Sequence, residues 1–210
     1  MANTNIKTDR RKERSVRTKK AIIIAAKKVF LKKGYMDTTF KDISECANVG
    51  YGTIYIYFNN KEDLLQTIVD DIMDKIGKEL YINYSPSDSS EAREVVYNQI
   101  YNMFEIAMAN QDLFRIISDA LSHSKVLRSH WEAIFNNFTK RTIEDLRYSQ
   151  KYGLAKKMQK RVIAKCIVYM VREFIWEFVW KREDNLEMVT NNIVALYFFG
   201  AYKTDNLLEE

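Results

Sequence analysis

The stretch NVGYGTIYIYFNNKEDLL, residues 48–65, decides the fold, because its centre can form either a strand or a helix. The centre is rich in β-branched and aromatic residues, and this composition favours a strand. In a helix, Ile54 and Phe58 lie four residues apart and both point inward. Tyr51 and Tyr55 then share an outer face at the same spacing. The stretch alone leaves both structures open.

The segments on either side decide in favour of a helix. Before the stretch, the sequence TFKD at residues 39–42 fits a capping box, and a short helix follows at about 40–47. After the stretch, Asn60 caps a long helix that begins at Lys61 and ends near Tyr81. A lone strand between two capped helices has no pairing partner, since no other segment has convincing period-two patterning. We therefore expect a helix-turn-helix, a motif whose second helix enters the major groove of DNA.

The composition predicts a folded, mostly helical chain with a basic N-terminal part. Of the 210 residues, 47% are apolar and 29% are charged, and one proline with six glycines is too few for a turn-rich β fold. Residues 1–60 contain 13 Lys and Arg against 5 Asp and Glu, whereas residues 61–210 contain 20 against 23. A basic end on a mildly acidic body indicates that the first 60 residues bind a polyanion. A solvated basic tail is the alternative.

Other features predict a soluble, cytoplasmic protein without a membrane span. No apolar stretch follows the charged N-terminus, so it does not fit a secretory signal. The longest apolar run, residues 163–180, is interrupted by four charged residues, which a membrane span rarely tolerates. Cys46 and Cys166 are isolated, as is typical of a reducing compartment rather than of a disulfide framework.

Helical periodicity and helix breakers predict an all-α fold in three parts. We expect a disordered basic arm at residues 1–16, a helix-turn-helix domain at 17–62 and a larger helical domain at 63–210. The first helix, from about Arg17 to Lys33, has Gly34 as its C-terminal stop. Further helices are expected near residues 61–81, 91–109, 111–121, 125–150, 156–181 and 185–202.

A composite pattern over residues 17–65 matches a known family. It comprises Ala25-Ala26, Phe30, Gly34, Thr38-Thr39, Asp42-Ile43, Ala47, Val49, Gly52-Thr53-Ile54-Tyr55, Tyr57-Phe58 and Lys61-Glu62-Asp63-Leu64-Leu65. The stretch resembles the DNA-binding domain of the TetR (tetracycline repressor) family of bacterial transcriptional regulators. The resemblance covers about a quarter of the chain, and the remainder agrees in length and helical content.

The resemblance implies two groups of DNA-binding residues. The group expected at backbone phosphates comprises Thr39, Lys41, Tyr55, Tyr57 and Lys61. The group expected to line the groove, at the start of the recognition helix, comprises Gly50, Tyr51, Gly52 and Thr53. Asn48, Gly50 and Tyr51 stand where the family usually has glycine, serine and lysine. We therefore expect this turn to carry an operator preference specific to the protein.

The resemblance also implies that the larger domain binds a small ligand and forms a homodimer. The candidate pocket, in an unusually aromatic region, comprises Phe104, Met108, Trp131, Phe135, Tyr169, Arg172, Glu173 and Trp176. The candidate dimer interface, on the last helix, comprises Val189, Ile193, Leu196, Tyr197 and Gly200. Ordinary core packing is the alternative for both sets. Glu173 with Glu177 suits a cationic ligand and Arg172 an anionic one, so the ligand's charge stays open.

These features predict a ligand-responsive, sequence-specific DNA-binding regulator. We expect a homodimeric repressor that leaves a palindromic operator on double-stranded DNA when it binds a small apolar or amphipathic molecule, such as a drug-like compound or a fatty acyl derivative. No enzyme, cofactor or metal is expected, because His123 and His130 lack accompanying ligands and no nucleotide-binding or nucleophile motif occurs. A constitutive DNA-binding protein and a thiol redox sensor remain alternatives.

Overall fold

The computed structural model describes the backbone of residues 2–80 and 83–199, and the side chains of residues 10–78 and 83–199. Within these ranges the regular structure is entirely helical, so the all-α prediction is confirmed. None of the described helices is long and apolar enough to cross a membrane. The chain divides into two compact units. Unit 1 consists of residues 1–72 and 112–130, and unit 2 of residues 73–111 and 131–210.

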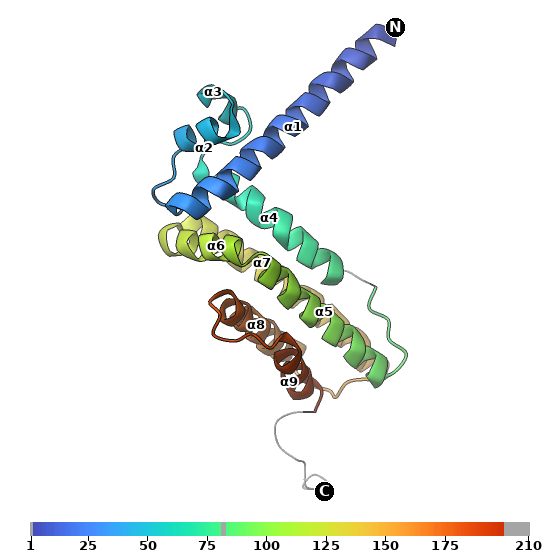
Figure 1. Ribbon diagram of the computed structural model, residues 1–210. Coiled ribbons are helices and arrows are strands. Elements are labelled where there is room, and N and C mark those ends of the chain that lie inside the picture. Colours follow the sequence, from blue (N-terminus) through green and yellow to red (C-terminus); the bar gives the residue numbers. More distant parts are fainter. Residues whose placement is uncertain (1, 81–82, 200–210) are drawn as a thin grey trace, which may run out of the picture. The chain divides into compact units, whose positions relative to one another are not determined.

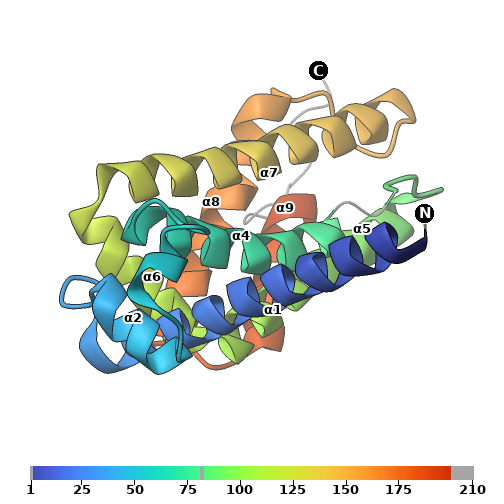
Figure 2. The ribbon, with the colours of Figure 1, turned by 90° about the horizontal axis from the view of Figure 1, so that it is seen from above.

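Unit 1 contains the predicted helix-turn-helix. Its elements are α1 (Ala2–Lys33), α2 (Phe40–Ala47), α3 (Tyr51–Ile54), the first part of α4 (Lys61–Leu80), nearly all of α6 (Gln111–His123) and the start of α7 (Lys125–Lys151), as labelled in Figure 1. Helices α1 and α2 pack against each other, and Figure 2 shows them from a second side. The buried side chains of α1 include Ile22, Ala26 and Phe30, which lie four residues apart on one face of the helix.

Helix α1 is longer than the sequence analysis predicts. It begins at Ala2, whereas residues 1–16 were expected to form a disordered arm. The first 33 residues contain no glycine or proline, and arginine, lysine and glutamate are good helix formers, so nothing in the sequence interrupts the helix. Its other end agrees with the prediction. Gly34 has a φ of 79° and its N–H donates to the carbonyl of Phe30 at 2.8 Å, which ends the helix.

The capping box predicted before α2 is present. The backbone N–H of Asp42 donates to Oγ1 of Thr39 at 3.2 Å, and the backbone N–H of Thr39 donates to Oδ2 of Asp42 at 3.0 Å. Helix α2 spans the predicted residues and ends at Asn48, whose φ of 52° lies in the left-handed region. This change of direction starts the turn between α2 and α3.

The segment whose structure was ambiguous, residues 51–58, is helical, as the flanking caps predict, but its α-helix is short. Helix α3 ends at Ile54, and one further turn is closed by the N–H of Phe58, which donates to the carbonyl of Ile54 at 2.9 Å. Ile54 and Phe58 are 0% and 1% exposed, so the predicted inward pair is confirmed. The two apolar anchors outweigh the local preference for a strand, because burial of both requires the four-residue helical spacing.

Helix α4 begins at the predicted residue. The side chain of Asn60 accepts a hydrogen bond from the N–H of Asp63 at 2.8 Å and so caps the helix. The fully buried side chains of this helix are spaced three or four residues apart or adjacent, and include Leu64, Leu65, Ile68, Ile72 and Ile76. The helix continues from unit 1 into unit 2, which begins at residue 73.

Helix α6 is tied to the helix-turn-helix inside unit 1 by two polar contacts. Oδ2 of Asp119 accepts a hydrogen bond from the backbone N–H of Tyr35 at 2.9 Å. The hydroxyl of Ser124, just after α6, donates to Oε1 of Glu62 at the start of α4. These contacts join residues that are more than 60 positions apart in the sequence. The sequence patterns gave no signal for this association.

Unit 2 contains the end of α4, most of α7, and three further helices. These are α5 (Ser89–Ala109), α8 (Lys160–Val179) and α9 (Leu186–Phe199). Each lies within a few residues of its predicted range. Helix α5 packs on both α8 and α9, and aromatic pairs fill the core. The rings of Phe104 and Phe178 are 4.8 Å apart, and those of Trp131 and Trp176 are 5.6 Å apart.

Candidate DNA interface and cavity

Two tyrosines form a joined, exposed surface on α3 and the turn after it. Tyr51 and Tyr55 are 53% and 50% exposed, and their hydroxyl oxygens are 2.9 Å apart. Their rings meet edge to face at 5.4 Å, and Tyr55 packs in the same way on Phe40 of α2 at 5.1 Å. The hydrogen bond to Tyr51 raises the pKa of Tyr55 above its ordinary value. The pair is therefore held in place before any ligand binds.

The other residues of this segment that were predicted to contact DNA, at the groove or at the phosphates, flank the pair. Gly50 and Gly52 are exposed, and a Cβ added at Gly52 would meet no atom within 4 Å. Gly52 thus faces open space, and no neighbouring atom of the protein would hinder an approaching duplex. Thr53 and Tyr57 are half-buried beside them. Within residues 50–57, only Ile54 is buried, and the exposed side chains include the apolar Ile56 as well as the tyrosine pair.

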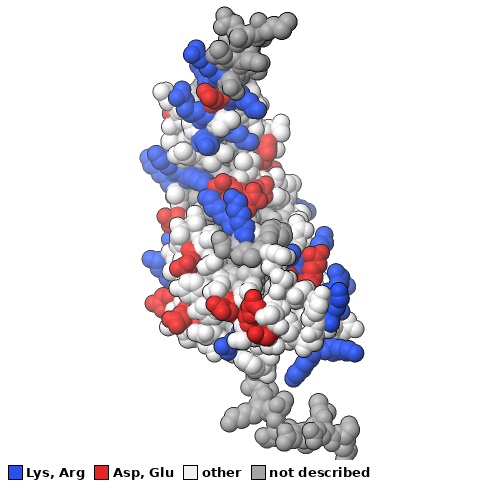
Figure 3. Space-filling view, turned by 90° about the vertical axis from the view of Figure 1, so that its right-hand side faces the viewer, with Lys and Arg blue, Asp and Glu red and all other residues white. Residues whose placement is uncertain are grey.

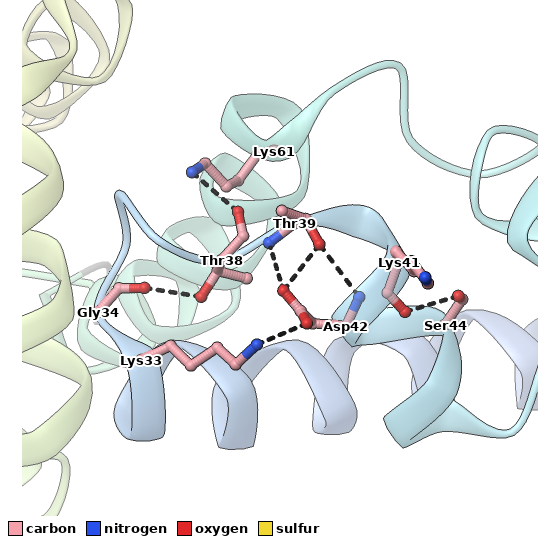
Figure 4. Close-up of polar contacts among 8 residues, drawn as sticks. All are labelled: Lys33, Gly34, Thr38, Thr39, Lys41, Asp42, Ser44 and Lys61. Carbon is pink, nitrogen blue, oxygen red and sulfur yellow. Dashed lines mark hydrogen bonds and ion pairs between the residues drawn. The ribbon is translucent and has the colours of Figure 1, made fainter.

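The hydroxyl group of Thr39 already makes hydrogen bonds within the protein, at the start of α2 (Figure 4). Its hydroxyl donates to Oδ2 of Asp42 at 2.7 Å, while the other carboxylate oxygen is 2.6 Å from Nζ of Lys33. The hydrogen bond from Lys33 is the largest of the interactions that hold the pKa of Asp42 far below its usual range. Thr39 therefore caps the helix, and its predicted phosphate contact requires its hydroxyl to rotate. Lys41, on the next turn, is exposed.

The ammonium group of Lys61 is directed into the protein rather than toward solvent. Nζ donates to the carbonyl oxygens of Tyr35 at 2.5 Å, Met36 at 2.9 Å and Thr38 at 3.0 Å; Figure 4 draws the last of these. It also lies 4.5 Å from the centre of the Tyr35 ring. Burial lowers its pKa, although Asp37, among other carboxylates, acts in the opposite direction. Because an ammonium group has three donors and all are used, this geometry does not favour the predicted phosphate contact.

A basic surface accompanies the tyrosine pair in unit 1. Residues 10–20 of α1 include seven arginines and lysines and one glutamate, and nearly all of these side chains are exposed. In Figure 3, Lys and Arg side chains gather just below the grey atoms at the top of the view, with Asp or Glu among them. This density of positive charge attracts a polyanion through its phosphates, without regard to sequence.

The residues of the predicted ligand pocket differ in burial. Phe104 and Trp131 are buried, whereas Met108 and Trp176 are half-buried, and Trp131 packs on Trp176. Phe135 alone among the predicted set lines the cavity described below.

The charged members of the predicted pocket have protein partners or face solvent. Arg172 lies 3.0 Å from Oε1 of Glu132 and 4.2 Å from the ring centre of Tyr169. Glu173 is exposed. Glu177 pairs with Arg182 at 3.3 Å. The contacts of these residues therefore favour neither a cationic nor an anionic ligand.

A cavity of about 70 Å³ lies instead between α5, α7, α8 and α9. Its walls are largely apolar, with Ile100, Phe138 and Val171 among them. Its polar groups are Tyr84, Gln99, Arg141, Thr142, Asp145 and Tyr197. The sequence contained one usable signal for this site. Asp145 follows Phe138 by seven residues and so falls on the apolar stripe of α7, where a charge requires an explanation.

The predicted dimer residues of α9 divide between the core and the surface. Val189 and Ile193 are 3% and 2% exposed, and are part of the core of unit 2. Tyr197 lines the cavity, and burial raises its pKa. Leu196 is 44% exposed and remains a surface residue. Gly200 lies outside the described residues.

Comparison with known proteins agrees with the geometry of unit 1. Residues 22–68 match the family model described as "Bacterial regulatory proteins, tetR family". Residues 22–68 therefore form a tetR-type DNA-binding segment. The resemblance read from the composite motif is thus confirmed, and curated relatives of the chain are named as helix-turn-helix transcriptional regulators.

Two curated relatives match part of the chain. The transcriptional regulator TtgR of Pseudomonas putida is 44% identical over 63 residues, which are 30% of each protein. YhgD of Bacillus subtilis is 31% identical over 105 residues, or 50% of this chain and 54% of the relative. Each match therefore spans at most about half the length of the relative.

Solved structures match over a larger part of the chain. FadR from Bacillus subtilis, in complex with stearoyl-CoA, has a TM-score of 0.69 at 20% identity, covering 87% of this chain and 98% of that one. The fatty acid degradation regulator FadR from Bacillus halodurans has a TM-score of 0.69 at 23% identity, covering 87% and 95%. At these identities the likeness establishes the fold alone.

Proposed function

We propose that this protein is a transcriptional repressor that binds a DNA operator as a homodimer and releases it on binding a small apolar or amphipathic molecule. The observation that carries the proposal is the exposed Tyr51–Tyr55 pair on a basic helix-turn-helix unit. Tyrosine hydroxyls bind phosphate oxygens, and their rings pack on sugars and thymine methyl groups. The match of residues 22–68 to the tetR-family model supports the same function.

The positive charge and the tyrosine pair have different tasks in this proposal. Residues 10–20 of α1 supply a sequence-independent attraction to phosphates, which decreases as the salt concentration rises. Residues 50–53 contact the groove and distinguish one operator from another, whereas Tyr55 and Tyr57 contact backbone phosphates. A two-fold dimer then presents two such surfaces about 34–36 Å apart, or a multiple of this distance, to match a palindrome.

Control by a ligand requires that unit 2 affects unit 1. Helices α4 and α7 each contribute residues to both units. A molecule that binds unit 2 more tightly in one setting of these helices shifts the population of DNA-competent dimers by its differential affinity. Stearoyl-CoA in the Bacillus subtilis FadR structure is consistent with an amphipathic ligand for this fold.

Selection of bound fragments from the source genome tests the DNA-binding proposal. We expect enrichment of one palindromic sequence, and fluorescence anisotropy should give weaker binding for Tyr55→Phe on this operator and on unrelated DNA, because Tyr55 is assigned to the backbone. Tyr152→Phe, an exposed tyrosine of unit 2, is the matched control and should bind like the unmodified protein. Absence of any enriched fragment, or unchanged affinity of Tyr55→Phe, contradicts the proposal.

The ligand arm of the proposal is tested separately. A thermal-shift screen against an apolar and amphipathic compound library should identify molecules that raise the denaturation midpoint, because binding to the native state alone stabilises it. The same molecules should then weaken operator binding. A constitutive DNA-binding protein would bind the operator, but no compound would change its affinity.

A further inference from the structure

We infer that the cavity of unit 2 binds the uncharged polar head of a small amphipathic molecule, with Gln99 as the residue that recognises it. The inference rests on the proposed ligand-controlled function and defines its ligand class. Three observations support it: an amide nitrogen without a hydrogen-bond partner among the described residues, an ion pair that balances its own charge, and apolar walls around both.

Gln99 is the polar side chain that indicates a ligand. It is 8% exposed, it lies on α5, and it lines the cavity. Its Nε2 has no hydrogen-bond partner among the described residues. A buried amide that makes no hydrogen bond is costly, and native proteins rarely retain one without a reason. A carbonyl or hydroxyl oxygen of a ligand would accept the hydrogen bond that this amide offers.

The charged groups of the cavity compensate each other. Nε of Arg141 lies 3.2 Å from Oδ1 of Asp145, one helical turn away on α7. The side chains are 23% and 17% exposed, so both are largely withdrawn from water. A carboxylate ligand would compete with Asp145 for Arg141, and an ammonium ligand would compete with Arg141 for Asp145. Either would add a third charge, without a partner of opposite sign, to a largely apolar site, which is unfavourable.

The remaining walls limit the rest of the ligand to a short apolar group. Ile100, Phe138 and Val171 line the cavity together with Met103, whose flexible side chain adapts to different shapes. The volume of about 70 Å³ is smaller than the roughly 150 Å³ apolar cavity that admits benzene. The head group and its first carbons therefore fit, and a longer chain requires movement of side chains. An uncharged amide or alcohol with a short alkyl chain meets all three conditions.

The test compares three six-carbon probes that differ only in the head group: hexanamide, hexanoate and hexylammonium. Binding to the full-length protein is followed by tryptophan fluorescence, since the Trp131 ring lies 5.1 Å from that of Phe135 in the cavity wall. We expect the Kd of hexanamide to be at least tenfold lower than those of both charged probes. Equal affinity for the three, tighter binding of either charged probe, or no binding of any overturns the inference.

The variant Gln99→Leu identifies the recognising residue. It removes the amide but keeps a side chain of similar size, so we expect the Kd of hexanamide to rise about three- to tenfold, in line with the loss of one hydrogen bond. Because an unsatisfied buried group is removed, the thermal midpoint of the free variant should not fall, and this separates loss of binding from loss of folding. An unchanged Kd contradicts the assignment of Gln99.

The matched control is Thr190→Val, a buried polar-to-apolar change on α9 away from the cavity lining, which should leave the Kd unchanged. Operator binding is measured in parallel on the same preparations. If the operator binds normally but the probes behave alike, the ligand class is wrong and the proposed DNA-binding function stands. If no operator is bound at all, the proposed function itself fails.

Discussion

At the scale of single residues, Lys41 and Lys61 were predicted to have the same role, but their side chains have different surroundings. Both were expected at DNA phosphates. The ammonium group of Lys61 instead donates to three carbonyls of residues 35–38 and orders the loop between α1 and α2, whereas Lys41 is exposed. A sequence motif reports that a lysine is present, but the direction of its side chain depends on the surrounding backbone.

We therefore expect opposite phenotypes for the two alanine variants. Lys61→Ala should lower the free energy of unfolding by about 1–3 kcal/mol, because buried carbonyls lose their donors, while the salt dependence of DNA binding is unchanged. Lys41→Ala should leave stability unchanged and reduce the slope of log affinity against log salt by about 1, as expected for one lost phosphate contact. Urea denaturation and fluorescence anisotropy at several salt concentrations measure the two effects. A reduced salt slope in Lys61→Ala would restore its predicted phosphate role.

The raised pKa of Asp145 predicts that the stability of the protein depends on pH. Burial raises its pKa from 3.8 to about 6, although Arg141 opposes the shift. Between about pH 4 and pH 6 the native carboxyl group keeps a proton that the unfolded chain loses, so this residue makes the protein less stable as the pH rises. The Asp145→Asn variant lacks this pH dependence. The thermal midpoint of the variant minus that of the unmodified protein should therefore increase from pH 4 to pH 6. Thermal denaturation at four pH values measures it.

The control for this pH effect is Glu144→Gln, a neighbouring exposed carboxylate. It should keep most of the pH dependence, because Asp145 remains. A constant difference between Asp145→Asn and the unmodified protein across this pH range would mean that the carboxyl group titrates as it does in water.

At the scale of elements, the turn between α2 and α3 depends on one left-handed residue. Asn48 has a φ of 52°, a conformation that asparagine tolerates better than most residues and that glycine adopts freely. Asn48→Ala should therefore lower the free energy of unfolding by about 1 kcal/mol, whereas Asn48→Gly should be neutral or slightly stabilising. Urea denaturation of both variants measures this. If both variants lose the same stability, the side chain of Asn48 matters rather than its backbone conformation.

Local signals predicted the elements of unit 1 closely, with one exception. The capping box at Thr39, the stop at Gly34 and the cap at Asn60 are each set by residues within four positions, so the sequence pattern contains them. The N-terminal half of α1 was missed because this basic segment was expected to be a disordered arm, although nothing in its sequence breaks a helix.

The cavity was largely missed because it is built from several helices. Gln99, Arg141 and Tyr197 come from three helices that are far apart in the sequence, and no periodic pattern brings them together. The aromatic residues that the sequence emphasised fill the core instead. Only Phe135 belongs to both sets.

At the scale of the whole molecule, the proposed dimer determines operator affinity. Leu196 is the predicted interface residue that remains exposed on α9, so Leu196→Glu should place a charge in the interface and shift the protein toward monomer. Operator affinity should then fall steeply, because two recognition surfaces are no longer linked. Sedimentation velocity and anisotropy measure the two effects.

The matched control for the dimer is Leu31→Glu, which changes an exposed leucine on α1 in unit 1. It should leave the oligomeric state unchanged. A Leu196→Glu protein that remains dimeric and binds its operator normally would move the interface away from this part of α9.

The hydrogen bond between Tyr51 and Tyr55 has a consequence for how operator preference can evolve. Each hydroxyl group has one proton, and the contact between them uses one of the two, so the pair presents a single remaining donor to DNA. A substitution at position 51 frees or reorients the hydroxyl at position 55, even though the second residue is unaltered. In divergent descendants of this gene, the two codons should therefore change together, and new binding sites should arise in paired steps.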